Sequence, residues 1–144
     1  MKYITKVFVD TSTWVESVLD NEKYHQAVKD CFQKEIEKGS IFFTCDYVID
    51  EAFTRLITNQ SFSLVAKFKK ILENLESKGE IKILWTDKSL FDKAWIVFKN
   101  YQEHKFSFTD AVIATIVKDL KIDEILTLDG GFKKIGLVVK PLID

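Results

Sequence analysis

Two aspartates each come directly after a short run of residues with the composition of a buried strand. Asp10 follows Val7–Val9, and Asp129 follows Glu124–Leu128. In a parallel sheet covered by helices, ligands bind at the edge where the strands end. We therefore expect both carboxylates to lie at one edge of the sheet, where they could bind a cation or a substrate.

Two more acids reach the same edge if the expected helices begin there. Glu51 lies early in the helix that follows the strand Ile41–Thr44, and Asp50 competes with it for this place. Asp110 lies in the first turn of the helix Phe108–Leu120. This helix must begin at the carboxyl edge in order to lead into the next parallel strand. Four acids that are distant in the sequence are thus predicted to converge.

A cluster of this kind needs a positive charge. Carboxylates within ~4–6 Å of one another repel, and at least one of them would take up a proton. Oxygen ligands without a nearby histidine or cysteine select a hard ion such as Mg²⁺ or Mn²⁺. Such ions can activate water and stabilise the leaving oxygen of a phosphodiester. His25 and His104 are too isolated for a metal-free ribonuclease mechanism built on paired histidines.

Short strand patterns alternate with longer helical patterns, and only five glycines and one proline interrupt them. The expected strands are Val7–Val9, Ile41–Thr44, Ile81–Trp85, Glu124–Leu128 and Leu137–Val139. The expected helices are Thr11–Leu19, Tyr24–Lys38, a helix capped by Asp46 that ends near Thr58, one from Ser61 or Ser63 to Leu75, Ser89–Tyr101 and Phe108–Leu120. This alternation is typical of an α/β domain with a mainly parallel sheet.

The composition fits one domain over residues 1–144, because 47% of the residues are hydrophobic and 30% are charged. A net charge of −1 argues against a protein that coats nucleic acid by bulk charge. Cys31 and Cys45 form no metal-binding or disulfide pattern, so a reduced, cytoplasmic setting is the simpler interpretation. We expect no signal peptide and no membrane-spanning segment, since no apolar run is long enough.

Four segments, in this order, resemble the motifs of the PIN-domain nucleases, and in particular those of the VapC-type toxins of prokaryotic toxin–antitoxin pairs. They are Val7–Ser12, Val48–Ala52, Ser107–Ala114 and Leu126–Phe132, and they extend over almost the whole chain. The resemblance implies a three-layer α/β/α sandwich around a mainly parallel sheet of four to five strands. It also implies a Mg²⁺- or Mn²⁺-dependent endoribonuclease that hydrolyses RNA, forms a homodimer and is bound by a small antitoxin protein.

The same resemblance implies roles for single residues. The catalytic and metal-binding set would be Asp10, Glu51, Asp110 and Asp129. The three aspartates would bind the metal most directly, and the glutamate would complete the site. Ser12 and Thr109 match polar positions that commonly support these carboxylates.

Two of the acids have structural alternatives at helix starts. Asp10 could merely cap the helix that begins near Ser12. Ser107 and Asp110 have the spacing of a capping box, with aspartate in place of the usual glutamate or glutamine. Capping and metal binding are compatible here, because Ser107 could hold the start of the helix while Asp110 faces the groove.

The other two acids also have structural alternatives. Arg55 stands four residues after Glu51, at the spacing of a helical ion pair worth roughly 0.3–0.5 kcal/mol. Asp129 precedes two glycines and could be only a turn residue. The sequence alone leaves these interpretations open beside the catalytic one.

Basic and aromatic residues near the expected site are candidates for contacts with RNA. The candidates for phosphate contacts are His104, Lys105, Lys133 and Lys134, and the alternative for each is a solvated surface position. Trp14 and Phe132 could stack on a base, although packing in the core is the alternative for both.

Two other classes of function remain open. A phosphoryl-transfer enzyme with Asp10 as its nucleophile, of the haloacid-dehalogenase type, would need a second aspartate where Ser12 stands. A non-catalytic RNA- or protein-binding module could keep the acidic pocket without turnover. RNA cleavage in the presence of Mg²⁺ or Mn²⁺ would separate these classes from the nuclease.

Overall fold

The sheet at the centre of the molecule is parallel throughout. The computed structural model describes residues 3–20, 23–59, 61–135 and 137–140. Within these residues five strands form one sheet in the order β3-β2-β1-β4-β5, and each neighbouring pair is parallel. The strands are β1 (Lys6–Val9), β2 (Ile41–Cys45), β3 (Ile81–Leu84), β4 (Glu124–Leu126) and β5 (Val139–Lys140). Since β1 is the middle strand, the residue that follows it lies at the centre of the carboxyl edge.

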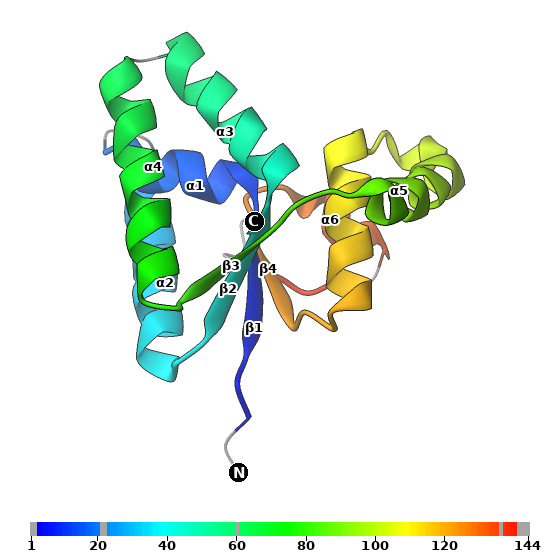
Figure 1. Ribbon diagram of the computed structural model, residues 1–144, viewed down its shortest axis with the longest axis horizontal. Coiled ribbons are helices and arrows are strands. Elements are labelled where there is room, and N and C mark those ends of the chain that lie inside the picture. Colours follow the sequence, from blue (N-terminus) through cyan, green and yellow to red (C-terminus); the bar gives the residue numbers. More distant parts are fainter. Residues whose placement is uncertain (1–2, 21–22, 60, 136, 141–144) are drawn as a thin grey trace.

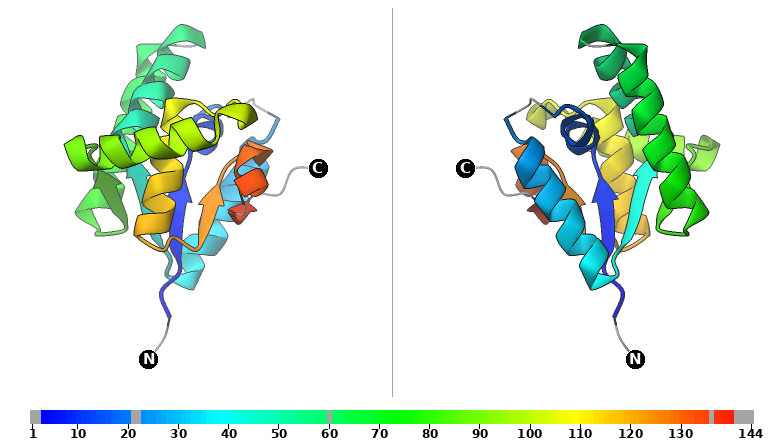
Figure 2. Two further views of the ribbon diagram at one scale, coloured as in Figure 1. Left: turned by 90° about the vertical axis from the view of Figure 1, so that its right-hand side faces the viewer. Right: turned by 90° about the vertical axis from the view of Figure 1, so that its left-hand side faces the viewer.

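Helices cover both faces of the sheet, which confirms the predicted three-layer α/β/α architecture. Helices α1 to α4 lie together on one side of the strands, and α5 and α6 lie on the other (Figure 1; Figure 2). The helices are α1 (Thr11–Val18), α2 (His25–Lys38), α3 (Asp46–Asn59), α4 (Phe62–Ser77), α5 (Lys88–Asn100) and α6 (Phe108–Asp119). Two short 3-10 helices are η1 (Gln102–His104) and η2 (Gly130–Ile135).

The interior is apolar because the middle strands have no face exposed to water. Val7–Val9 of β1 are fully buried. Trp14 of α1 packs against Phe32 and Phe68, with ring centroids 5.5 and 5.4 Å away. Its indole N–H donates to the Thr44 hydroxyl at 3.2 Å. The first helix after β1 is therefore anchored to β2 as well as to two other helices.

Helix α6 is apolar on nearly all sides, as its sequence predicts, and the structure buries it accordingly. Residues 111–117 are all buried, because α5 covers the side of α6 that faces away from the sheet. The helix starts at the carboxyl edge and leads back to the beginning of β4 (Figure 1). Its first turn is consequently held at the same edge as the ends of β1 and β2.

Asp46 was predicted to cap α3 from outside, and this was wrong. It is the first residue of the helix, because β2 runs directly into α3. Its carboxylate accepts hydrogen bonds from the Thr86 backbone N–H at 2.9 Å and from the Thr86 hydroxyl at 2.7 Å. The side chain therefore ties the start of α3 to the segment that follows β3.

The last two strands also differ from their predicted ranges. β4 ends at Leu126, two residues early, because the chain beyond it bonds to side chains at the start of α1 instead of to a strand. The Ser12 hydroxyl accepts from Leu128 N–H at 3.0 Å. β5 is Val139–Lys140, later than the expected range. None of the helices among the described residues has the length and hydropathy needed to cross a membrane.

Candidate active site

The four predicted acids line one cavity at the carboxyl edge of the sheet. The cavity has a volume of about 400 Å³. Its described lining includes Asp10, Ser12, Glu51, Arg55, Ser107, Asp110 and Asp129, and we call it the acidic cavity. Asp50, the alternative to Glu51, is exposed and is absent from this lining. Segments that are far apart in the sequence thus meet as the order of the strands predicts.

Asp10 is the most deeply placed of the four acids, with 6% of its surface exposed. One carboxylate oxygen accepts from Thr11 N–H at 2.7 Å, and the other accepts from the Thr127 hydroxyl at 2.7 Å. The pKa of Asp10 is raised to about 6, mainly by burial. The charges of Asp110 and Glu51 contribute to this rise, and the two hydrogen bonds oppose it. Asp10 caps α1 and faces the cavity at the same time.

Thr127 connects two of the acids, and the sequence analysis missed it. Its hydroxyl donates to Asp10 and accepts from Asp129 N–H at 3.0 Å. The Ser12 hydroxyl lies 3.4 Å from it. A single hydroxyl within the otherwise apolar run at β4 was the signal that could have identified it, because a buried hydroxyl needs hydrogen-bond partners.

Asp110 forms the predicted capping box and also lines the acidic cavity. Ser107 and Asp110 form a capping box, with Ser107 N–H donating to the carboxylate at 3.1 Å and Asp110 N–H donating to the Ser107 hydroxyl at 3.0 Å. Asp110 also lines the acidic cavity. Burial raises its pKa, and the charges of Asp129 and Glu51 add to this effect. Thr109 is half-buried in the same turn but is absent from the cavity lining.

Glu51 and Asp129 each form the local interaction that the sequence predicted as an alternative. Glu51 accepts from the Arg55 guanidinium at 2.6 Å. Asp129 is exposed, and its carboxylate accepts from Gly131 N–H at 2.9 Å. A Cβ atom on Gly131 would lie 3.2 Å from that carboxylate, which explains why the smallest residue suits this position.

The donor set has the chemistry that a hard divalent cation requires. All four donors are carboxylates. Burial is the main cause of the raised pKa values of Asp10 and Asp110, the charges of the neighbouring acids add to it, and a cation between the carboxylates would oppose both effects. Among the described residues, no three acidic, histidine or cysteine side chains are close enough together to hold one ion. Two of the acids are held by local partners within this region, since Glu51 pairs with Arg55 and Asp129 accepts from Gly131 N–H.

A family model of the PIN domain matches residues 7–137. The chain belongs to the PIN domain family. A VapC ribonuclease of Archaeoglobus fulgidus is 31% identical over 100 residues, which cover 65% of this chain and 56% of that protein. This PIN domain therefore spans little more than half the length of that relative.

Solved structures share the fold of this PIN domain at low sequence identity. VapC20 of Mycobacterium tuberculosis, described as a sarcin-ricin loop cleaving toxin, superposes with a TM-score of 0.80 at 21% identity, over 92% of this chain and 96% of that one. A second structure is VapBC2 of Rickettsia felis, bound to a DNA fragment from the VapBC2 promoter. It superposes with a TM-score of 0.70 at 11% identity, over 94% of this chain and 98% of that one. The fold prediction made from the four segments is thus confirmed.

The aromatic candidates for base stacking belong to the core of the PIN domain. Trp14 and Phe132 are each only 1% exposed, so neither ring is free to receive a base. His104 and Lys105 are exposed and line a second cavity beside the first. Lys133 is exposed on η2, and the side chain of Lys134 lies outside the described residues.

Proposed function

We propose that this PIN domain is a Mg²⁺- or Mn²⁺-dependent endoribonuclease and the toxin of a toxin–antitoxin pair. One observation carries the proposal: four carboxylates from distant segments line one cavity, and the pKa values of two of them are raised. Such a cluster is suited to binding a cation and a phosphodiester together. The similarity to a VapC ribonuclease supports the choice of RNA as the substrate.

In this proposal Asp10, Asp110 and Asp129 hold the metal, and Glu51 completes the site. When bound, the ion supplies Lewis-acid activation of the attacking water and of the scissile phosphate. Thr127 keeps the Asp10 carboxylate turned toward the cavity through its 2.7 Å hydrogen bond. Ser107 does the same for Asp110 through the capping box.

Arg55 supplies the positive side chain of the acidic cavity. It is the only arginine in the chain, and its guanidinium is within hydrogen-bond distance of Glu51. A guanidinium presents several donors to the oxygens of a phosphate. We expect Arg55 to exchange its contact with Glu51 for one with the RNA backbone, which would free Glu51 for the metal.

The geometry favours the nuclease over an aspartyl-nucleophile enzyme. A nucleophilic carboxylate needs an oxygen that can reach the phosphorus atom. Asp10 is 6% exposed, and each of its oxygens already accepts a short hydrogen bond. A carboxylate held in this way is better suited to binding a metal ion than to attacking a phosphorus atom.

The proposed partners are an antitoxin protein and a second copy of the chain. Exposed apolar side chains on and just before α5 give the homodimer a physical basis; they are Trp85, Phe91, Trp95 and Ile96. An antitoxin follows from the similarity to VapBC2 and the VapC ribonuclease. We place this activity in the cytoplasm, where Cys31 and Cys45 would stay reduced.

The experiment that tests the function is a titration of the purified, chelator-treated protein with Mg²⁺ and with Mn²⁺. We expect heat of binding by calorimetry and RNA cleavage to rise over the same metal concentrations. Removal of metal should lower the cleavage rate by roughly 10²-fold or more, since the ion contributes several kcal/mol to the transition state. Asp110→Asn is the control, and it should lose both signals.

Other results of the titration would contradict the proposal in distinct ways. Metal binding without cleavage of any RNA, by protein free of a partner, would identify a non-catalytic module. Cleavage that persists undiminished in chelator would remove the metal from the mechanism. A covalent phosphate analogue trapped on Asp10 would favour the aspartyl-nucleophile class.

Thr127→Val tests whether the hydroxyl positions Asp10. Its loss leaves one oxygen of Asp10 and the N–H of Asp129 without this partner. We expect cleavage to fall about 10–100-fold, the usual effect of removing a group that orients a metal ligand. Thr115→Val is the matched control, because the buried Thr115 hydroxyl donates only within α6, to Ala111 C=O. Equal activity of the two variants would show that Thr127 has no positioning role.

A further inference from the structure

A second cavity lies directly beside the acidic cavity and has no part in the proposed chemistry. It has a volume of about 430 Å³, and we call it the His104 cavity. Asp110 and Asp129 line both cavities, so the two share a wall. The buried rings of Phe106 and Phe132 form its floor, with centroids 6.0 Å apart. A chain bound across the acids would extend naturally into this space.

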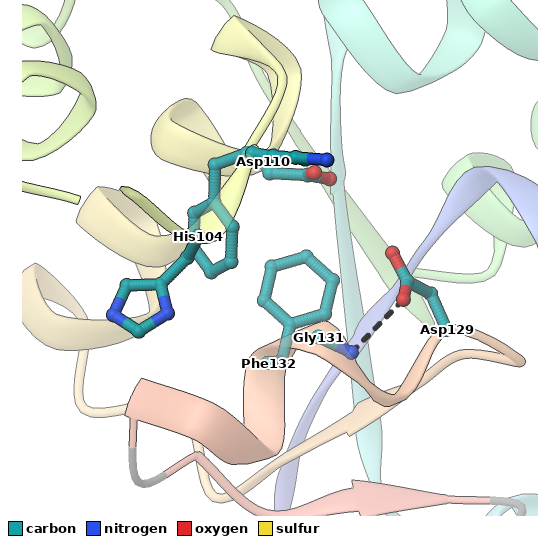
Figure 3. A pocket seen from close by; sticks show the side chains of 7 residues that line it. His104, Asp110, Asp129, Gly131 and Phe132 are labelled. Carbon is teal, nitrogen blue, oxygen red and sulfur yellow. Dashed lines mark hydrogen bonds between the residues drawn. The ribbon is translucent and has the colours of Figure 1, made fainter. Parts of the chain in front are cut away.

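The charges are arranged from one side of the His104 cavity to the other. Figure 3 shows Asp129 on one side and His104 on the other, with the ring of Phe132 between them. Lys105 adds a second basic side chain next to His104. Both are exposed, and Lys105 forms no ion pair with any residue that the structure describes. An anion is therefore favoured at the side remote from the acids.

The backbone at Lys105 is unusual for a lysine. Lys105 ends η1 in the left-handed region, with φ 55° and ψ 37°. A glycine adopts this conformation without the steric cost that a side chain brings. The position would thus suit glycine better for folding alone, and a lysine there directs a positive charge to the cavity rim.

We propose that the His104 cavity is the subsite for the RNA nucleotide next to the cleaved bond. Lys105 and His104 bind the phosphate of that nucleotide, and the rest of the nucleotide occupies the space between them and the acids. The proposal rests on the nuclease function, because the acidic cavity must hold the neighbouring phosphodiester. Single-stranded RNA fits best, since its backbone and bases can turn away from a helix into such a space.

Lys105→Gly is the decisive variant, and Lys121→Gly is its matched control. Lys121 is the other non-glycine residue with positive φ among those described, at φ 54°, and it is an exposed lysine at the far end of α6. Both variants should keep or raise the melting temperature, because both relieve the same strain. Only Lys105→Gly should raise the KM for RNA several-fold while changing kcat less than about twofold. Lys105→Met should repeat the RNA effect while retaining the backbone strain.

A binding measurement separates this proposal from the nuclease function itself. Fluorescence anisotropy with a labelled single-stranded RNA, at several salt concentrations, should give a salt slope that is smaller by about 0.7–1 for Lys105→Gly than for Lys121→Gly. Equal affinities and slopes for the two variants, with cleavage intact in the unmodified protein, would overturn the subsite alone. RNA that neither binds to nor is cleaved by the unmodified protein would overturn both proposals.

Discussion

Asp10→Asn is expected to abolish RNA cleavage and, at the same time, to stabilise the metal-free protein at neutral pH. The loss of cleavage should be at least ~10²-fold, or about 2.7 kcal/mol of transition-state stabilisation. The amide has no negative charge with which to bind a cation, and Asp10 lies at the centre of the carboxyl edge. A single change would thus separate stability from activity, as is common at active sites.

The gain in stability follows from the pKa of the carboxyl group. Burial is the main reason that the pKa of Asp10 rises from 3.8 to about 6. The folded state therefore binds the proton more tightly than the unfolded state, so the free energy of unfolding falls as the pH rises between these values. Above about pH 6 this cost is on the order of 3 kcal/mol in the absence of metal. An asparagine at this position has no ionisable group, so the variant does not have this free-energy cost.

The hydrogen bonds around residue 10 can accept an asparagine. Its amide oxygen would accept from Thr11 N–H, as one carboxylate oxygen does now. Its amide N–H would donate to the Thr127 hydroxyl, which could turn its own proton toward Ser12, 3.4 Å away. This rearrangement keeps a partner for each group that now bonds to Asp10, so the fold should remain intact.

Chemical denaturation in the presence of a chelator measures the effect. The free energy of unfolding of the unmodified protein should fall from pH 4 to pH 7. That of Asp10→Asn should change less over this range and should be higher than that of the unmodified protein at pH 7. Mg²⁺ should then stabilise the unmodified protein and leave the variant unchanged. A variant that cleaves RNA normally, or that keeps the full pH dependence, would refute the role assigned to Asp10.

Trp14→Ala is expected to have the largest effect on folding. The side chain is 1% exposed, and its ring packs between Phe32 and Phe68. Removal leaves a cavity and deprives the Thr44 hydroxyl of its indole donor. Such changes cost about 3–5 kcal/mol, a large part of the ~5–15 kcal/mol that stabilises a typical domain. Since α1 begins directly after Asp10, the acidic cavity should be lost with the packing.

Trp95→Ala provides the control for this prediction. Trp95 has the same side chain but lies on the outer surface of α5 with 53% of it exposed. We expect its removal to change the free energy of unfolding by about 1 kcal/mol or less. Thermal unfolding of the two variants in parallel compares them directly. Similar melting temperatures would mean that Trp14 does not anchor α1.

The sequence predicted the convergence of the acids because that convergence depends only on strand direction and helix order. Once β1 and β4 are parallel neighbours, Asp10 and Asp129 must follow their ends at the same edge. The buried helix α6 was equally predictable, since its apolar residues leave no polar face. These features follow from local patterns together with a single rule of topology.

The sequence could not predict contacts that depend on where side chains meet in space. Thr127 is separated from Asp10 by 117 positions, and its place in an apolar run indicates that its hydroxyl needs a partner but does not indicate which residue is that partner. Thr86, which bonds to Asp46, is 40 positions away from it. The left-handed conformation of Lys105 at the end of η1 is likewise unexpected from a lysine in the sequence. Local propensity does not predict such contacts, because they form only after the helices and strands pack together.

The position of β1 between β2 and β4 makes the acidic cavity depend on segments from distant parts of the sequence. Asp10 N–H donates to Leu126 C=O, and the Asp10 carboxylate accepts from the Thr127 hydroxyl, 117 positions away. While β1 and β4 remain unpaired, neither the Thr127 hydroxyl nor the Asp129 carboxylate lies beside Asp10. If the proposed function holds, a partly folded chain has no catalytic centre, and cleavage begins only after the sheet has closed around β1.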